Sequence, residues 1–305
     1  MNRVAIIGAG HVGSTAAYAL MLRALFREIV LVDNDQALAA AEAADISDAN
    51  AQARPARIWA GDYGDAAAAQ IAVITAGAAT HGAESRMSVA GKSAEIVGEC
   101  TTDLMAAGFA GVLIVASNPV DLMALTAFRH SGLPATRVIG TGTLLDSGRL
   151  RQALAAKLHV APAALHAMIL GEHGDSQVAA FSAAHIGGVP LEQFAPGLAA
   201  DLGKIADEVK RAAYRIIEGK GHTSFGIATA IVRICEAVLR DERSVLPVSV
   251  MLDGEFGLSD VYMSLPCIIG AAGVERILLP DLSPTEREDL RASALALAEA
   301  QRTLG

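Results

Sequence analysis

The sequence predicts an α/β fold, in which a doubly wound parallel sheet is followed by a second, α+β domain. Three observations support this prediction. A glycine-rich turn separates the first apolar run from the first helical segment. Short apolar runs then alternate with helical segments, and this residue pattern changes beyond Gly140. Strands of a parallel sheet are covered on both faces, so they read as nearly continuous apolar runs. We therefore place the two domains at residues 1–143 and 144–305.

The first strand is expected at Val4–Ile7, where four apolar residues lead directly into Gly8-Ala9-Gly10-His11-Val12-Gly13. Residues 14–25 then have helical composition. In a strand, G-x-G-x-x-G, helix unit, the first glycine permits a tight turn. The second lets a pyrophosphate approach the backbone, and the third lets helix and strand pack closely. The amide groups at the helix N-terminus would face the phosphates.

A second apolar strand is expected at Ile29–Val32, and it ends at Asp33, twenty residues past Gly13. A carboxylate at this position accepts hydrogen bonds from the ribose hydroxyls of an adenosine and repels a 2′-phosphate. The pattern therefore predicts a dinucleotide site that prefers NAD to NADP. The alternative is a coincidental glycine turn, which the ordered arrival of strand, glycines, helix, strand and acid disfavours.

The remaining elements follow the same alternation. Further strands are expected at 57–60, 71–75, 112–115 and 138–139, and helices at 36–46, at 90–107 and after Pro119, which suits a first helical turn. Beyond Gly140 we expect a long helix opening at 141–151, an amphipathic helix over 202–218, a helix ending near 240, antiparallel strands at 245–252 and 261–265, and a closing helix over 284–304.

Two strand ends in the first half carry polar residues. The fourth strand gives way to a loop over 78–87 that contains small residues and Arg86, and Asn118 follows the fifth strand. Ligands bind outside the carboxyl ends of strands in open α/β sheets. We interpret the loop as a lid that closes over a ligand and brings in a cation; a solvated loop with a surface arginine is the alternative. Asn118 either binds cofactor and substrate or caps the next helix.

The second half holds Gly171-Glu172-His173-Gly174-Asp175-Ser176, entered from an apolar run. Glycines on both sides let the chain turn sharply, and histidine exchanges protons near neutral pH, so His173 is a candidate for proton transfer. The alternative is a histidine packed in a turn. Asp146 and Arg149 share one face of the preceding helix, where they either serve a site or form an intrahelical salt bridge.

The bulk composition excludes several classes of function. The chain is 52% hydrophobic with a formal net charge of −9 and a pI near 5.4, which argues against nucleic-acid and anionic-membrane partners. Its three cysteines are odd in number and lack a Cys-x-x-Cys pair, which predicts reduced thiols, a cytoplasmic location and no zinc or other metal site. The uncharged run over 104–120 is shorter than a typical membrane span.

Taken together, these motifs resemble the L-lactate and malate dehydrogenase superfamily, and most closely its bacterial L-lactate dehydrogenases, over essentially the whole chain. The resemblance implies a Rossmann domain that binds NAD, a catalytic domain and a homotetramer that acts in glycolysis and pyruvate fermentation. It rests on the glycine turn at 8–13, Asp33-Asn34-Asp35, Thr75-Ala76-Gly77, Glu84-Ser85-Arg86, Ser117-Asn118-Pro119-Val120-Asp121, Leu145-Asp146-Ser147-Gly148-Arg149 and the His173 segment.

The resemblance also implies a role for each candidate residue. His173 would accept the hydroxyl proton of a 2-hydroxy acid while hydride leaves for the nicotinamide. Asp146 would hold the imidazole tautomer and stabilise the imidazolium. Arg149 would bind the substrate carboxylate through two parallel hydrogen bonds. Arg86 would polarise the substrate carbonyl, and Asn118 would position its oxygen.

By the same resemblance, Thr223 and Ile227 line the pocket for substrate and nicotinamide. The residues implied to contact the cofactor are Gly8, Gly10, His11, Val12, Gly13, Asp33, Thr75, Ala76, Gly77, Asn118 and Ile227.

Thr80 departs from the family at the position that reads the substrate side chain. Lactate dehydrogenases typically carry glutamine there and malate dehydrogenases arginine, and a second substrate carboxylate needs a cation because an unpaired buried charge is costly. Threonine supplies none, so we expect lactate and pyruvate as the substrate pair, with room for larger 2-oxo acids. The alternatives are a malate or broad-specificity 2-hydroxyacid dehydrogenase, and an NAD-binding protein that has lost catalysis.

Arg151 and His166 match positions at which allosteric bacterial lactate dehydrogenases bind fructose 1,6-bisphosphate. The resemblance therefore implies a bisphosphate effector bound across a subunit interface. Ordinary residues of a helix and a strand end are the alternative.

Overall fold

The computed structural model describes residues 2–53, 55–78 and 86–304, without the side chains of 86–88 and 304. The helices are α1 His11–Leu22, α2 Gln36–Asn50, α3 Tyr63–Ala67, α4 Arg86–Ala106, α5 Val120–Ser131, α6 Leu144–Leu158, α7 Leu191–Phe194, α8 Leu202–Lys210, α9 Ala212–Lys220, α10 Phe225–Leu239 and α11 Pro284–Leu304.

The strands confirm each one expected from the sequence and add several short ones. They are β1 Arg3–Ile7, β2 Glu28–Val32, β3 Arg57–Ala60, β4 Ile71–Ile74, β5 Val112–Val115, β6 Val138–Gly140, β7 Leu165–His166, β8 Ile169–Leu170, β9 Val178–Ala179, β10 His185–Ile186, β11 Val189–Pro190, β12 Ser244–Asp253, β13 Ser259–Gly270 and β14 Gly273–Ile277.

In the described part of the chain, one nine-stranded sheet has the order β14-β13-β12-β6-β5-β4-β1-β2-β3. The strands from β3 to β6 pair in parallel, as the apolar runs predict. β12 then joins β6 in antiparallel fashion, with Ser249 opposite Gly140, and β13 and β14 extend the antiparallel part. The strands of the second half thus continue the sheet of the first half, and the predicted doubly wound α/β fold with an added α+β part is confirmed.

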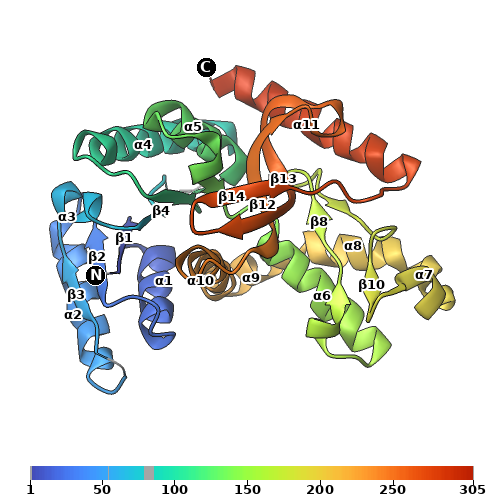
Figure 1. The fold of residues 1–305 in the computed structure, drawn as a ribbon, viewed down its shortest axis with the longest axis horizontal. Helices are drawn as coiled ribbons and strands as arrows, with labels where there is room; N and C mark the ends of the chain where they lie inside the picture. Colours follow the sequence, from blue (N-terminus) through green and yellow to red (C-terminus); the bar gives the residue numbers. More distant parts are fainter. Residues whose placement is uncertain (1, 54, 79–85, 305) are drawn as a thin grey trace.

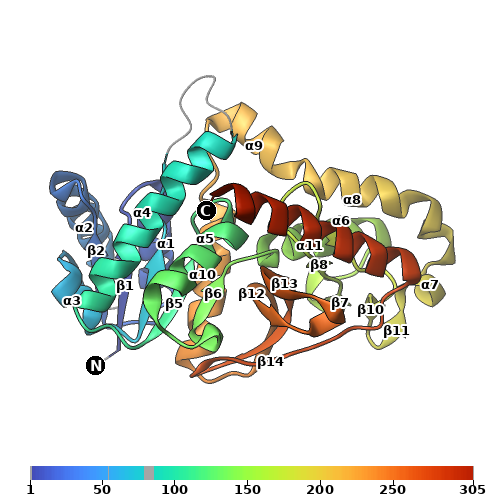
Figure 2. The same ribbon diagram turned by 90° about the horizontal axis from the view of Figure 1, so that it is seen from above.

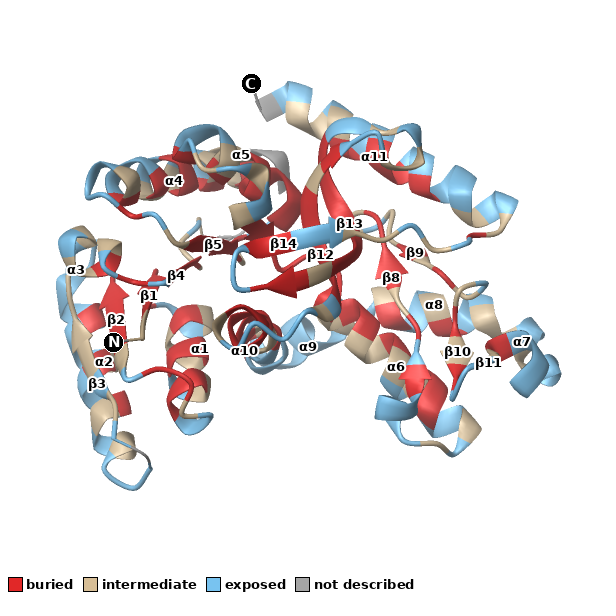
Figure 3. Ribbon diagram, in the orientation of Figure 1, coloured by how far each residue is buried: buried red, intermediate tan, exposed pale blue. Residues whose placement is uncertain are grey.

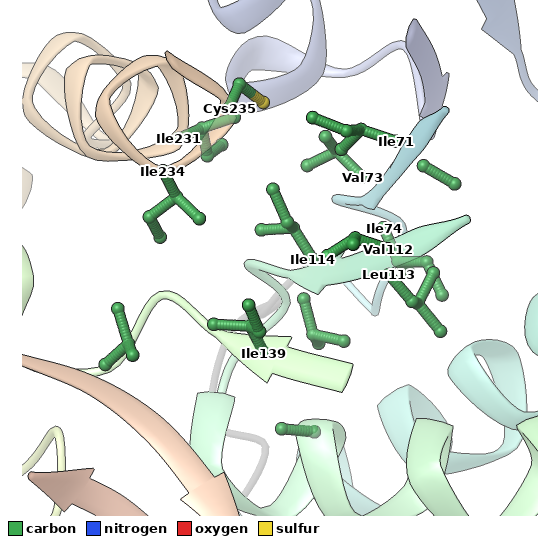
Figure 4. Close-up of a cluster of buried hydrophobic side chains, with 14 of the residues drawn as sticks. Ile71, Val73, Ile74, Val112, Leu113, Ile114, Ile139, Ile231, Ile234 and Cys235 are labelled. Carbon is green, nitrogen blue, oxygen red and sulfur yellow. The ribbon is translucent and has the colours of Figure 1, made fainter. Parts of the chain in front are cut away.

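Helices cover both faces of the parallel sheet (Figure 1), with α4 and α5 on one side and α1 and α10 on the other. β4, β5 and β6 are buried along their whole length, and β1 and β2 are buried after their first residue, which Figure 3 shows as a red central layer. The edge strand β3 is half-buried to exposed. In Figure 4, Ile231 and Ile234 of α10 lie against the sheet that contains Ile114 and Ile139. Burying one such side chain contributes about 1.5–3 kcal/mol. A helix from the second half of the chain therefore completes the core of the first half.

The second half builds its own smaller core around α6, α8 and the sheet β11-β10-β7. The long helix α11 packs on β13 and β9 and reaches α5 (Figure 2). The amphipathic helix expected over 202–218 is instead two helices that meet at Arg211. α8 buries Ile205 and Val209, whereas α9 buries none of its residues, so only the first of the two helices packs into a core.

The helix expected over 90–107 corresponds to α4, which begins earlier, at Arg86. Across residues 2–53, 55–78 and 86–304, we find no helix that combines the length and the apolar composition needed to span a bilayer.

Candidate active site

The surroundings of Gly8 and Gly13 leave no room for a side chain in the first turn. Gly8 has φ +104°, and a Cβ there would lie 2.6 Å from the backbone nitrogen of Ala76. A Cβ on Gly13 would lie 1.8 Å from the carbonyl oxygen of Gly8, so helix and strand pack too closely for alanine. A Cβ on Gly10 would meet no heavy atom within 4 Å, which leaves its backbone accessible to a ligand.

Hydrogen bonds fasten this turn to the neighbouring strands. Thr75 Oγ1 donates to the carbonyl oxygen of Gly8 at 2.7 Å. Asp33 Oδ2 accepts from the backbone N–H of Ala9 at 2.6 Å, and its Oδ1 accepts from that of Asp35 at 2.9 Å. Because a carboxylate oxygen has two lone pairs, half-buried Asp33 retains acceptor capacity for the hydroxyls of a ribose.

The N-terminus of α1 fits a pyrophosphate. Its first internal hydrogen bond runs from Ser14 N–H to Gly10 O, so the amides of residues 11–13 have no partner within the helix. These amides and the helix dipole favour an anion at this place. The His11 ring stacks on that of His222, with centroids 4.0 Å apart and an interplanar angle of 14°. Burial, His11 and Lys220 together lower the pKa of His222, a residue that sequence reasoning missed.

The ends of β4 and β5 meet beside this turn. Ser117 Oγ donates to the carbonyl oxygen of Ala76 at 2.5 Å, and the exposed Asn118 follows directly. A Cβ on Gly77 would lie 3.5 Å from Ser93 Oγ of α4. The half-buried Val12 and Ile227 pack against the main core nearby, on α1 and α10.

A second cluster, at the N-terminus of α6, joins three of the predicted residues. His173 Nδ1 lies 2.5 Å from Asp146 Oδ2, and Arg149 Nη1 donates to Asp146 Oδ1 at 2.9 Å. The Asp146 side chain is 3% exposed, and those of Arg149 and His173 are 16% and 25% exposed. The carboxylate is therefore buried between two groups that reach toward solvent.

The charges in this cluster favour a protonated histidine. Burial alone would lower the pKa of His173, but Asp146, and to a smaller extent Asp121, raise it above its ordinary value of 6.5. Burial alone would raise the pKa of Asp146, but His173 and Arg149 hold it below its ordinary value of 3.8. Because Asp146 accepts from Nδ1, Nε2 is the nitrogen that remains to exchange a proton.

Distant segments hold the histidine turn in place. Gly171 has φ +85°, and its backbone exchanges two hydrogen bonds of 2.9 Å with Ser264 of β13. Ser293 of α11, which is fully buried, accepts from the backbone N–H of Glu172 at 2.9 Å. The Glu172 carboxylate in turn accepts from the backbone N–H of Ser176 at 3.1 Å. The turn is thus fixed by β13 and α11 as well as by its glycines.

Asp121 contacts the same turn, although the sequence analysis gave it no role. Its carboxylate accepts from the backbone N–H of His173 at 2.8 Å and from Ser249 Oγ at 2.5 Å. Its place in the Asn-Pro-Val-Asp motif at 118–121 was the one available signal. Ser249 and Ser293 carried no signal, because their contacts form between segments far apart in the chain.

Three further residues were predicted to contact the substrate. Thr80 lies outside the described residues, as does the side chain of Arg86. Thr223 is half-buried in the short loop between α9 and α10, beside His222.

Arg149 also lines a cavity of about 620 Å³ together with Arg151, Arg215 and Arg233. His166 lines a different cavity, of about 220 Å³, so a single chain does not bring Arg151 and His166 into one cavity. No group of His, Cys, Asp and Glu within the described part of the chain is arranged to hold a metal ion.

Two family models divide the chain between them. Residues 2–140 match the lactate/malate dehydrogenase NAD binding domain, and residues 143–303 match the lactate/malate dehydrogenase alpha/beta C-terminal domain. Among relatives, the chain is 44% identical to the L-lactate dehydrogenase of Thermus aquaticus over 308 residues, which cover 99% of both chains. It is 43% identical to that of Limosilactobacillus reuteri, over 97% of this chain and 93% of the relative.

Solved structures agree with these matches. The minor L-lactate dehydrogenase of Enterococcus mundtii in its ligand-bound form superposes with a TM-score of 0.97 at 38% identity, over 100% of this chain and 98% of that one. The ligand-unbound form of the same enzyme gives a TM-score of 0.92 at 37% identity, over 99% and 97%. The chain belongs to the lactate/malate dehydrogenase family.

Proposed function

We propose that this protein is an NAD-dependent L-lactate dehydrogenase in which His173 is the proton acceptor. The observation that carries the proposal is the cluster of His173, Asp146 and Arg149, found in a chain similar over nearly its full length to L-lactate dehydrogenases. The glycine turn and Asp33 fit the dinucleotide. Bound NAD supplies the hydride acceptor for lactate oxidation and, as NADH, the donor for pyruvate reduction.

The residues of the chain do the binding and the proton transfer. Arg149 keeps one nitrogen on Asp146 and presents its remaining donors to the substrate carboxylate. His173 takes the hydroxyl proton of lactate on Nε2, and the resulting imidazolium is stabilised by Asp146. In the reverse direction the same nitrogen returns the proton to the oxygen of pyruvate. Asn118 orients that oxygen, and Arg86 polarises the carbonyl once the loop before α4 has closed.

Substrate choice follows from Thr80, which offers no cation to a second carboxylate. The test is NADH oxidation by the purified protein with pyruvate, oxaloacetate, 2-oxobutyrate and phenylpyruvate. Pyruvate should exceed oxaloacetate in kcat/KM by at least about tenfold. A preference for oxaloacetate would refute the lactate assignment, whereas broad use of larger 2-oxo acids would indicate a broad-specificity 2-hydroxyacid dehydrogenase. No turnover with NADH bound would indicate an NAD-binding protein without catalysis.

We also propose that the protein forms a homotetramer. Large apolar side chains stay exposed on α9 and at the start of α10, with Phe225 at 72%, Ile217 at 47% and Tyr214 at 44%. Exposed apolar patches of this kind mark interfaces. Light scattering on the purified protein checks the mass, since a monomer at micromolar concentration would contradict the proposal.

Fructose 1,6-bisphosphate is the effector we propose for Arg151 and His166. Arg151 is half-buried and His166 is exposed. Because they line separate cavities within one chain, a bisphosphate would bridge them only across a subunit interface. Activation should appear as a fall in the KM for pyruvate that is lost in Arg151→Gln. Unchanged kinetics across a bisphosphate titration would remove the proposal.

Two further assignments stay proposals. We place the boundary between the NAD-binding and catalytic domains at residues 143 and 144, and the enzyme in the cytoplasm. The structure keeps Cys100, Cys235 and Cys267 as free thiols, which supports the second assignment.

A further inference from the structure

Asp121 is a buried carboxylate that the mechanism above does not use. It is the second residue of α5 and lies three residues after Asn118, with 2% of its surface exposed. The N-terminus of a helix favours a negative charge, which offsets part of the cost of burial. In the chain it therefore follows both the end of β5 and Asn118, the residue proposed to orient the substrate oxygen.

The carboxylate joins three segments of the chain. Its Oδ2 accepts from the backbone N–H of His173 at 2.8 Å, and its Oδ1 accepts from Ser249 Oγ at 2.5 Å. Ser249 is fully buried on β12, opposite Gly140 at the end of β6. Asp121 therefore ties the histidine turn both to α5 and to the point where the two parts of the sheet meet.

The charges around this carboxylate are few and identifiable. Burial, with a smaller contribution from Glu172 in the same turn, raises the pKa of Asp121 from 3.8 to about 6, although the hydrogen bonds from Ser249 and His173 lower it. Asp146 and Asp121 favour the charged form of His173, and Arg149 opposes it. Two carboxylates thus bond to this histidine, Asp146 to its side chain and Asp121 to its main chain.

We propose that Asp121 is a positioning residue for His173: it anchors the main chain of the histidine turn to α5, and its charge adds to that of Asp146 in retaining the imidazole proton. The inference rests on the proposed role of His173 in proton transfer. A buried carboxylate is costly unless it is hydrogen-bonded or serves a site, and here one of its two hydrogen bonds comes from His173 itself. Through its bond to the main chain of His173, Asp121 holds the histidine in a fixed position relative to Asn118.

The decisive variant is Asp121→Asn, which removes the charge and conserves the shape. The amide oxygen can still accept from His173 N–H, and the Ser249 hydroxyl can rotate to accept from the amide nitrogen. The matched control is Asp289→Asn on the exposed face of α11, which removes the same charge from a solvated position. Ser249→Ala tests the hydrogen bond while leaving the charge in place.

The readout is the pKa of His173 measured by NMR titration of the ligand-free protein, with its signal assigned by its absence from His173→Gln. In Asp121→Asn we expect this pKa to fall by about one unit, because the imidazolium loses a neighbouring anion. Asp289→Asn should leave it unchanged. Pyruvate reduction needs the protonated imidazole, so the pH midpoint of kcat/KM should fall with it, at an unchanged Kd for NADH.

The outcomes separate the possible roles. An unchanged His173 pKa in a folded Asp121→Asn variant, with activity reduced equally at every pH, would leave Asp121 a structural anchor and overturn the proposal. If the variant does not fold, the wild-type titration decides. The His173 signal should then show a second inflection near pH 6, where Asp121 gains its proton, and its absence would also overturn the proposal. A protein that does not reduce pyruvate at all fails the proposed function instead.

Discussion

Replacing Asp146 by asparagine tests the electrostatic basis of the proposed mechanism. Asp146 Oδ2 lies 2.5 Å from His173 Nδ1, and Oδ1 accepts from Arg149 at 2.9 Å. The substitution keeps the volume of the side chain but removes the charge that faces the imidazole. An amide nitrogen directed at Nδ1 would also favour the tautomer that carries its proton on Nε2, which is the wrong tautomer for accepting a proton from lactate.

The magnitude follows from the geometry. The charge centres of an imidazolium and a carboxylate joined in this way lie about 4 Å apart, which corresponds to about 4 kcal/mol at an effective dielectric constant of 20. That energy is equivalent to about three pKa units. A hydrogen bond from Nδ1–H to the amide oxygen of the asparagine would reduce the fall in the pKa of His173 to about two. At a pH well above the wild-type pKa of His173, the protonated fraction then drops about a hundredfold. We expect kcat/KM for pyruvate reduction to fall by about 10²–10³.

The assay is NADH oxidation with pyruvate across a pH series, together with the Kd for NADH. In the wild type, pyruvate reduction should decline as pH rises through the raised pKa of His173, because the imidazolium is the proton donor. In Asp146→Asn that decline should move to lower pH, so lowering the pH recovers activity in the variant. Asp48→Asn, which removes an exposed charge from α2, is the matched control and should behave as wild type.

The Kd for NADH should not change, because Asp146 lies in the cluster at α6 and outside the glycine turn. A pH midpoint that stays in place, or a loss of activity explained by weaker NADH binding, would refute this account of the histidine. Cooperative thermal unfolding of the variant would show that the activity is not lost through misfolding.

Three further predictions concern residues of the glycine turn at 8–13, its neighbour Asp33 and the histidine turn. Gly13→Ala should lower the free energy of unfolding by about 3 kcal/mol or more, because its Cβ would lie 1.8 Å from the carbonyl oxygen of Gly8. The measurement is thermal unfolding. Gly91→Ala is the control and should show no such loss, because its Cβ meets nothing within 4 Å. Asp33→Ser should raise the KM for NADH about tenfold and permit turnover with NADPH; continued rejection of NADPH would contradict the assigned ribose contact. Ser293→Ala should lower the free energy of unfolding, measured by chemical denaturation, by about 1–3 kcal/mol, because the histidine turn loses its hydrogen bond to α11. It should also lower kcat at an unchanged Kd for NADH. An unchanged kcat would argue against a coupling between α11 and the histidine turn.

The sequence by itself determined the glycine turn, the parallel strands and the identity of most site residues. The turn at 8–13 is a local unit, in which the need for Gly8 and Gly13 arises from atoms of the turn itself and of the adjacent strand end. The apolar strands are equally local signals, because burial on both faces of a parallel sheet requires uninterrupted apolar residues. The family motifs identified His173, Asp146 and Arg149, which the structure joins by hydrogen bonds.

Only the tertiary structure decided how the second half completes these units. The bond from His173 to Asp146 spans 27 residues, that from His173 to Asp121 spans 52, and that from Ser249 to Asp121 spans 128. Contacts of this range leave no periodic pattern in the sequence, since they depend on where complete elements dock. For the same reason β12 was not expected to extend the sheet of the first half, nor the helix over 202–218 to be interrupted at Arg211. Chain-local geometry set the elements, and long-range packing set the surroundings of His173.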